Sequence, residues 1–226
     1  MRPLIGMIPF CEEIGDRGED EEKLVKETLM KYAQELHRLG VLPVIFFEDI
    51  DRNDIRTMDA ILLYGRWRGR GEGFGELEER EKYRLIFSET NSPLLCVGQG
   101  CSVLNHLCDG RVSQGIQVNT PKIPGAVLPE QDIRVYEGTK LFECIGKSSM
   151  LQDVKVEART RKIGENLRVS AMNGNGDIVG VEGVEDRFIL GIEWDLIDET
   201  KEEKLLSDEN YLILSGFIQM TMKYSS

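Results

Sequence analysis

The stretch that decides the fold runs from Ser92 to Asn105 and has the sequence SPLLCVGQGCSVLN. Its first half contains an uninterrupted apolar run, which is typical of a short buried strand. After it, Val103 and Leu107 have the spacing of one helix face. Gly98 stands between the two halves, in the triplet G-Q-G, which permits a tight turn. The stretch therefore predicts a strand, a sharp turn and a helix in immediate succession.

This layout is that of a nucleophile elbow, in which the turn raises a catalytic side chain above the sheet. Here Gly98 holds the place of the nucleophile and has no side chain that could attack a substrate. Glycine also relaxes the strained backbone that such turns hold. Two interpretations stay open: a former active site whose shape is kept, and a plain glycine turn of an α/β protein. The sequence around the turn favours the first.

The first half of the chain alternates strands with helices. Apolar runs predict strands at Leu4–Ile8, Leu42–Phe47 and Asp59–Tyr64, and helical periodicity predicts helices over Glu21–Leu39 and Glu76–Thr90. Such alternation predicts an α/β fold with a doubly wound, mostly parallel sheet.

The second half has a different character, with short β runs separated by turn residues. These runs lie at Ile133–Tyr136, Val154–Ala158, Leu167–Ala171, Ile178–Val181 and Phe188–Ile192. Asn173 to Gly176 predicts a hairpin turn, and Asp208 is a candidate cap for a final helix. No linker divides the chain, so we expect one domain over residues 1–226 with a β-rich second half.

The chain resembles the class I glutamine amidotransferase-like superfamily, and within it the gamma-glutamyl hydrolase branch, which includes the gamma-glutamyl-GABA hydrolases. The branch has P-V-L-G-I-C-R-G-M-Q-L-L-N at its elbow, and without gaps its Cys falls on Gly98 and its Arg on Gln99. Three further stretches are similar to family segments, in the same order: RPLIGMIP at Arg2–Pro9, DAILLYG at Asp59–Gly65 and GIEWD at Gly191–Asp195. The resemblance implies a flavodoxin-like fold and hydrolysis of gamma-glutamyl or other amide C–N bonds.

The departures from the family pattern fall on its catalytic triad. The nucleophile, the histidine base and the acid that orients it correspond to Gly98, Asp195 and Ile197. The chain has only two histidines, His37 and His106, and neither is near the GIEWD motif. A cysteine hydrolase needs a thiolate within reach of an oriented base. We therefore expect a catalytically degenerate member that is not an active enzyme.

Residues Arg66 to Gly75, RWRGRGEGFG, follow the third predicted strand, at the sheet edge where α/β folds bind ligands. Their arginines could grip a carboxylate or phosphate in two-point contacts, or they could pair with neighbouring glutamates in a solvated loop. With the resemblance, this position predicts a site for a small anionic or gamma-glutamyl-like ligand. The ligand-binding residues that we expect are Gly65, Arg66, Arg68, Gly98, Gln99 and Asp195.

Other chemistries and roles stay open. Cys96 or Cys101 could act as a displaced nucleophile, and Asp195 or Glu193 could act as a general base in a different reaction. Alternatively, the protein binds a protein partner, or a second copy of itself as a homodimer, and has a purely structural role in that assembly.

Composition excludes several classes of function. The net charge of −12 argues against binding to nucleic acid and to anionic membrane surfaces. No apolar run approaches the length of a membrane span, and five scattered cysteines without a C-x-x-C motif favour reduced thiols in a cytoplasmic protein. No glycine pattern fits a nucleotide cofactor and no side-chain spacing fits a metal site, so we expect neither a cofactor nor a metal.

Overall fold

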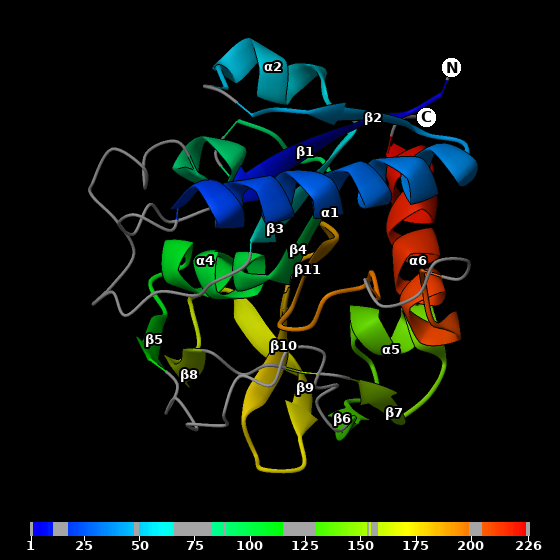
Figure 1. Ribbon diagram of the computed structural model, residues 1–226. Helices are drawn as coiled ribbons and strands as arrows, with labels where there is room; N and C mark the ends of the chain where they lie inside the picture. Colours follow the sequence, from blue (N-terminus) through cyan, green and yellow to red (C-terminus); the bar gives the residue numbers. More distant parts are fainter. Residues whose placement is uncertain are drawn as a thin grey trace.

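The computed structural model describes residues 2–10, 18–47, 50–65, 83–87, 89–114, 130–152, 154, 158–198 and 205–224. Its centre is a sheet, to which these residues contribute nine strands (Figure 1). The strands lie in the spatial order β2 (Leu42–Ile45), β1 (Leu4–Phe10), β3 (Ala60–Gly65), β4 (Leu94–Gly98), β11 (Ile189–Ile192), β10 (Ile178–Gly183), β9 (Leu167–Asn173), β6 (Gln131–Val135) and β7 (Ser149–Gln152).

The sheet is parallel on one side and antiparallel on the other. Strands β2, β1, β3, β4 and β11 pair in parallel, whereas β10, β9, β6 and β7 continue the sheet in antiparallel pairs. A separate antiparallel ribbon joins β5 (Arg111–Gln114) to β8 (Ala158–Lys162). The predicted α/β fold with a β-rich second half is confirmed.

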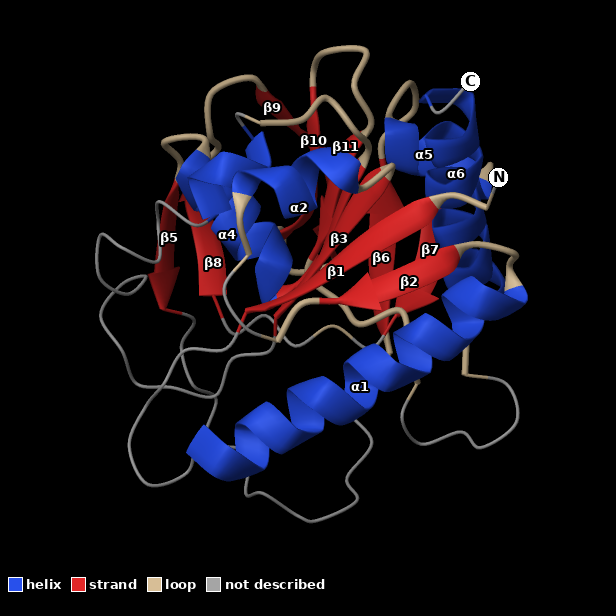
Figure 2. Ribbon diagram, turned by 90° about the horizontal axis from the view of Figure 1, so that it is seen from above, coloured by secondary structure: helices blue, strands red, loops and turns tan. Residues whose placement is uncertain are grey.

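Helices cover both faces of the sheet (Figures 1 and 2). One face carries α1 (Gly18–Arg38), α5 (Lys140–Ile145) and α6 (Asp208–Tyr224), and the other carries α2 (Arg52–Thr57) and α4 (Gln99–Leu107). Two apolar clusters fill the two layers, and β3 sends alternate side chains into each, so it is buried throughout.

The structure corrects some sequence-based boundaries. Of the strand expected over Val154–Ala158, Val154 lies in no strand, Ala158 is the first residue of β8, and residues 155–157 lie outside the described residues. The carbonyl of Val154 accepts a hydrogen bond from the Gln131 side chain at 2.8 Å and takes no part in a strand ladder. Of the helix expected over Glu76–Thr90, residues 83–87 are helical and most of the rest lies outside the described residues.

Two short helices, α2 and α5, were missed. Each spans only six residues and begins at a capping side chain. Asp51 accepts hydrogen bonds from the first turn of α2, and Thr139 accepts one from the first turn of α5. No described helix has the length and apolarity that crossing a membrane requires.

Candidate functional site

The turn between β4 and α4 has the geometry of the predicted elbow. Gly98 ends the strand and is also the residue before the first turn of α4, with φ 60° and ψ −128°. Residues with a side chain rarely adopt this backbone conformation, and glycine adopts it without steric cost. The sequence prediction of strand, turn and helix is therefore confirmed.

Strand β3 approaches this turn so closely that it leaves no room for a side chain. A Cβ atom at position 98 would lie 2.5 Å from the carbonyl oxygen of Gly65, which is its register partner on β3. A Cβ atom at Gly100 would lie equally close, 2.5 Å, to the carbonyl oxygen of Leu63. Both glycines are thus required by the close approach of two backbone segments.

The same contact brings together three of the predicted site residues. Gly65, at the end of β3, packs against Gln99, whose Cβ atom would be 3.1 Å from a Cβ added at Gly65. Gln99 is the first residue of α4 and is only 7% exposed. Its side-chain oxygen is buried and accepts no hydrogen bond from any residue within the described ranges. A buried polar atom left without a partner costs about 1–3 kcal/mol, so this oxygen is a group that a bound donor would satisfy.

Asp195, at the position of the family histidine, follows β11, the strand beside β4. Its two carboxylate oxygens accept hydrogen bonds from the hydroxyl groups of Tyr32 on α1 at 2.6 Å and Tyr64 on β3 at 2.7 Å. The backbone N–H of Ile197 donates a further hydrogen bond to the carboxylate at 3.0 Å. Burial, together with the adjacent Asp195 carboxylate, raises the pKa of Tyr32 well above its ordinary value. The carboxylate is thus held by two tyrosine hydroxyl groups and one backbone N–H.

Sequence reasoning missed both tyrosines as site residues. Tyr32 lies in the apolar stripe of α1, and Tyr64 lies in the apolar run of β3, so each was interpreted as core. A buried tyrosine hydroxyl needs a hydrogen-bond partner. That requirement was the signal that could have pointed to a shared acceptor.

Ile197, which the resemblance aligns with the family's acid, lies in an apolar environment. Ile197 is 3% exposed, packs in the larger apolar cluster and pairs with Leu206 in an isolated bridge. Arg66 and Arg68, the predicted clamp for an anion, lie outside the described residues.

The comparisons with known proteins agree with this geometry. The sequence profile of the Peptidase C26 family matches residues 78–195, which is just over half of the chain. The chain belongs to the Peptidase C26 family. No curated protein sequence matches it.

Two solved structures share the fold. A candidate GMP synthase component from Thermoplasma acidophilum is similar with a TM-score of 0.70 and 14% identity, over 100% of this chain and 97% of that one. The glutaminase domain of Trypanosoma brucei CTPS with bound acivicin is similar with a TM-score of 0.55 and 12% identity, over 98% of this chain and 94% of that one. At such identities the likeness shows the glutamine amidotransferase-like fold alone.

The thiols around the Peptidase C26 elbow are buried. Cys101, in the first turn of α4, is 2% exposed, and burial together with the Glu193 carboxylate raises its pKa well above the ordinary value. Burial also raises the pKa of Cys96, on β4, strongly. Glu193 is itself buried and accepts a hydrogen bond from Ser102 at 2.9 Å. Cys96 and Cys101 are therefore protonated at neutral pH and poor nucleophiles, whereas Cys11 lies outside the described residues.

The two histidines lie away from the elbow turn. His37 is in the last turn of α1, and His106 is in the last turn of α4. Over the described ranges, no group of three His, Cys, Asp or Glu side chains is arranged to hold a metal ion.

Proposed function

We propose that this Peptidase C26 member does not hydrolyse amide bonds and instead binds a small amino-acid-like ligand at the elbow. The observation that carries the proposal is the contact between Gly98 and the Gly65 carbonyl, which occupies the space of a nucleophile's Cβ atom. Where a hydrolase would hold a side chain ready to attack, the backbone of β3 closes over the turn.

The rest of the hydrolytic machinery supports this proposal. A thiolate needs a base, and the base needs an orienting acid. The carboxylate of Asp195 stands in the place of the base and is held by Tyr32 and Tyr64, while Ile197 stands in the place of the acid. Both oxygens of Asp195 already accept hydrogen bonds, so a role as general base would require breaking this network.

Several groups around the turn suit an amino-acid-like ligand. The backbone N–H groups of the first turn of α4 favour a carboxylate, because the helix begins with unpaired donors and a partial positive charge. The buried oxygen of Gln99 lacks a donor, which an ammonium or amide group of the ligand would supply. Arg66 and Arg68 remain proposed contacts for an anionic group. We propose Asp195 as a ligand contact only where the tyrosine network leaves its carboxylate accessible.

The test measures hydrolysis and binding in the same preparation. With glutamine and gamma-glutamyl amides we expect no release of ammonia or amine, and saturable binding of at least one of these compounds by calorimetry. Gln99→Met removes the acceptor at nearly constant volume and should weaken binding about tenfold. Gln219→Met, on the exposed side of α6, is the matched control and should bind as the wild type does. Catalytic release of ammonia would contradict the claim that the protein does not hydrolyse amide bonds. Absence of binding by every compound would contradict the claim that it binds an amino-acid-like ligand.

Thiol labelling separates this proposal from a hydrolase with a displaced cysteine. Burial raises the pKa of Cys108 to about 11 and of Cys144 to about 12, against an ordinary thiol value of 9.0. At pH 8, Cys108 should therefore react with iodoacetamide about a hundredfold more slowly than an ordinary thiol, and Cys101 should react only after unfolding. Rapid stoichiometric labelling of Cys101 in the folded protein would support the displaced nucleophile instead.

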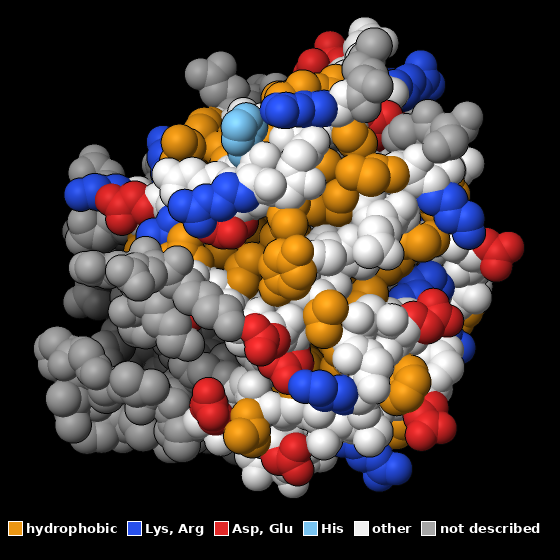
Figure 3. Space-filling model, turned by 90° about the vertical axis from the view of Figure 1, so that its right-hand side faces the viewer, with side chains coloured by type: hydrophobic (Ala, Val, Ile, Leu, Met, Phe, Trp, Pro, Cys, Tyr) orange, Lys and Arg blue, Asp and Glu red, His pale blue; other side chains and the backbone are white. Residues whose placement is uncertain are grey.

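A second proposal is that the protein acts with a partner. The Thermoplasma acidophilum protein is described as one subunit of a synthase. In the present chain, hydrophobic side chains gather on the face over α6 (Figure 3), and Tyr211, Leu212 and Met222 on that helix are each at least 38% exposed. Exposed apolar patches mark interaction surfaces. If this face joins two copies, light scattering should show a dimer that Leu212→Glu dissociates; a wild-type monomer at all concentrations would exclude the homodimer.

A further inference from the structure

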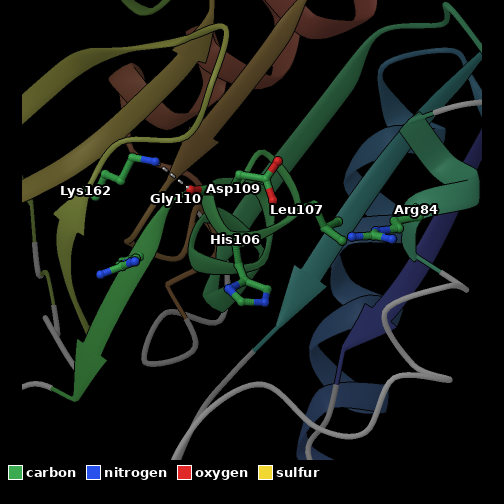
Figure 4. A pocket seen from close by; sticks show the side chains of 7 residues that line it. Arg84, His106, Leu107, Asp109, Gly110 and Lys162 are labelled. Atoms are coloured by element: carbon green, nitrogen blue, oxygen red, sulfur yellow. Dashed lines mark hydrogen bonds between the residues drawn. The ribbon is translucent and has the colours of Figure 1, made fainter.

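A second candidate site lies at the opposite end of α4 from the elbow. A cavity of about 380 Å³ is lined there by Arg84, His106, Asp109, Arg111 and Lys162, together with the backbone around the turn that follows the helix. The nine residues of α4 place this cavity about 13 Å from the elbow. In Figure 4, Lys162 and Arg84 enter from opposite sides and His106 lies between them. The volume is within the range of small-molecule sites.

The lining has the opposite charge from the rest of the protein. Arg111 and Lys162 line the cavity with a single carboxylate, Asp109, and Arg84, which also has a partner of its own, adds a third cation, whereas the whole chain carries −12. The four charged groups come from different parts of the sequence: the helical residues 83–87, the turn after α4, and strands β5 and β8. Such convergence in an acidic protein produces a local positive potential that concentrates anions.

Two of the cations are placed where they repel each other. Arg111 on β5 and Lys162 on β8 are register partners in the antiparallel ribbon. Like charges directly opposite on neighbouring strands are destabilising. The guanidinium group of Arg111 makes no hydrogen bond or ion pair with any residue that the structure describes. A like-charge pair in which Arg111 has no ion-pair partner among the described residues is expected where a ligand supplies negative charge.

The backbone around the cavity is held in one arrangement. Asn105 is fully buried: its side-chain nitrogen donates to the carbonyl oxygen of Lys162 at 3.0 Å, and its side-chain oxygen accepts from the N–H of Gly164 at 2.8 Å. Asp109 has φ 60°, the left-handed conformation with which many helices end, and the N–H groups of Asp109 and Gly110 donate to the carbonyl oxygens of His106 and Asn105 at 3.0 and 2.9 Å.

Capping of the helix end explains only part of the charge. Lys162 donates to the carbonyl oxygen of Asp109 at 3.3 Å, and cations near a helix C-terminus are favourable. That role accounts for the lysine but not for Arg111, whose charge makes the placement of Lys162 worse.

We propose that this cavity binds a small molecule through a phosphate group. A phosphate monoester carries up to two negative charges and three acceptor oxygens, which match the net charge of the lining and its fork-shaped arginine donors. The carboxylate of Asp109 disfavours a longer polyanion and suits a hydroxyl or amino group on the same ligand. This site is separate from the elbow and does not depend on the function proposed there.

The test uses the two histidines as reporters in the full-length protein. Ring signals in nuclear magnetic resonance should shift for His106 and not for His37 when inorganic phosphate or glycerol phosphate is added. Calorimetry should show one saturable site. Arg111→Gln and Lys162→Gln should each weaken binding about tenfold, as loss of one charge-assisted contact predicts.

Arg161→Gln is the matched control, because Arg161 is the neighbour of Lys162 on β8, where successive side chains point to opposite faces, and it does not line the cavity. Each variant is first shown to unfold at the wild-type temperature within a few degrees. No shift at His106, equal weakening by Arg161→Gln, or binding of succinate in preference to both phosphates would overturn the proposal. Binding at the elbow can fail or succeed without changing any of these outcomes.

Discussion

The two ends of helix α4 differ in almost every physical respect. At the elbow, Gly98 and Gly65 bring backbone against backbone, and the nearby carboxylate of Asp195 is bonded by two tyrosine hydroxyls. At the other end, charged side chains from four segments surround a cavity, and two cations stand opposite each other on a β ribbon. One end presents only glycine backbone at its turn, and the other holds charges that the fold alone does not require.

Stability measurements can distinguish a structural framework from a binding site. Close contacts and satisfied hydrogen bonds stabilise the folded protein, so their loss should lower the free energy of unfolding substantially. An unbalanced cluster of charges destabilises slightly, so its removal should be harmless or favourable unless a ligand is present. The stabilities of variants at the elbow and at the cavity therefore test whether the first serves the fold and the second serves binding.

The largest effect is expected at the elbow. Gly98→Ala places a Cβ atom 2.5 Å from the Gly65 carbonyl and forces a side chain into a left-handed conformation. The steric collision and the backbone strain together should lower the free energy of unfolding by about 3 kcal/mol or more. Urea denaturation followed by circular dichroism measures this loss.

Gly138→Ala is the control that measures the cost of a positive φ without a steric collision. Gly138 also has a positive φ, 74°, but a Cβ atom there would meet nothing within 4 Å. We expect it to cost roughly 1 kcal/mol. If the two variants were equally stable, the close approach of β3 to the elbow would be wrong, and a side chain at position 98 would again be feasible. Gly98→Cys tests this directly, and we expect no gain of amidase activity.

The next effect concerns Asp195. Asp195→Ala leaves the buried hydroxyl groups of Tyr32 and Tyr64 without their acceptor and should cost about 3 kcal/mol. Asp195→Asn keeps an acceptor and should cost less. If Asp195→Ala were neutral in stability, the tyrosine network would not hold the carboxylate, and a catalytic role for it would become more plausible.

The pH dependence of the same network has a definite sign. The pKa of Tyr32 is raised in the folded protein above its ordinary value of 10.0. The unfolded chain therefore loses this proton first, and the free energy of unfolding should fall as the pH rises above about 10. Tyr32→Phe should make the fall shallower, while buried thiols contribute the same slope in both proteins.

A smaller loss is expected at Asn105, which holds the turn at the far end of α4. Asn105→Ala leaves the Lys162 carbonyl and the Gly164 N–H without their partner and should cost about 2 kcal/mol. Asn175→Ala, in the exposed hairpin between β9 and β10, is the control and should change stability by less than about 0.5 kcal/mol. Equal stability of the two variants would show that the cavity backbone is not fixed by Asn105.

Sequence patterns within single segments predicted the strands and helices of the sheet framework better than the contacts of the two candidate sites. The apolar runs of β1, β3 and β4 and the periodicity of α1 are signals within one segment, and the structure confirms them. The G-Q-G triplet predicted the elbow turn at Gly98, because such a turn depends only on the backbone conformation of the residues within it. The short helices α2 and α5 were missed because six residues are too few to establish a period.

The chemistry of both ends of α4 depends on contacts between distant segments, which the sequence does not display. Tyr32 and Asp195 are 163 residues apart, and no local pattern joins them. Arg111 and Lys162 become neighbours only when β5 pairs with β8, and no pattern within either segment indicates that pairing. The proposed absence of a triad rests, by contrast, on the residue types at Gly98, Asp195 and Ile197, which can be read directly from the sequence.

The smallest expected change in stability is at Arg111, and whether it is a gain or a loss decides whether the two ends of α4 differ. In phosphate-free buffer of low ionic strength, Arg111→Gln should raise the free energy of unfolding by about 0.3 kcal/mol, because it removes a like-charge pair. High salt should abolish the gain by screening. Millimolar phosphate should reverse the order, because a ligand that binds the folded state stabilises the wild type more than the variant. Arg161→Gln loses a hydrogen bond to Ser113 and should show neither the gain nor the reversal. A destabilised Arg111→Gln in the absence of phosphate would mean that this arginine serves the fold, and the far end of α4 would then resemble the elbow after all.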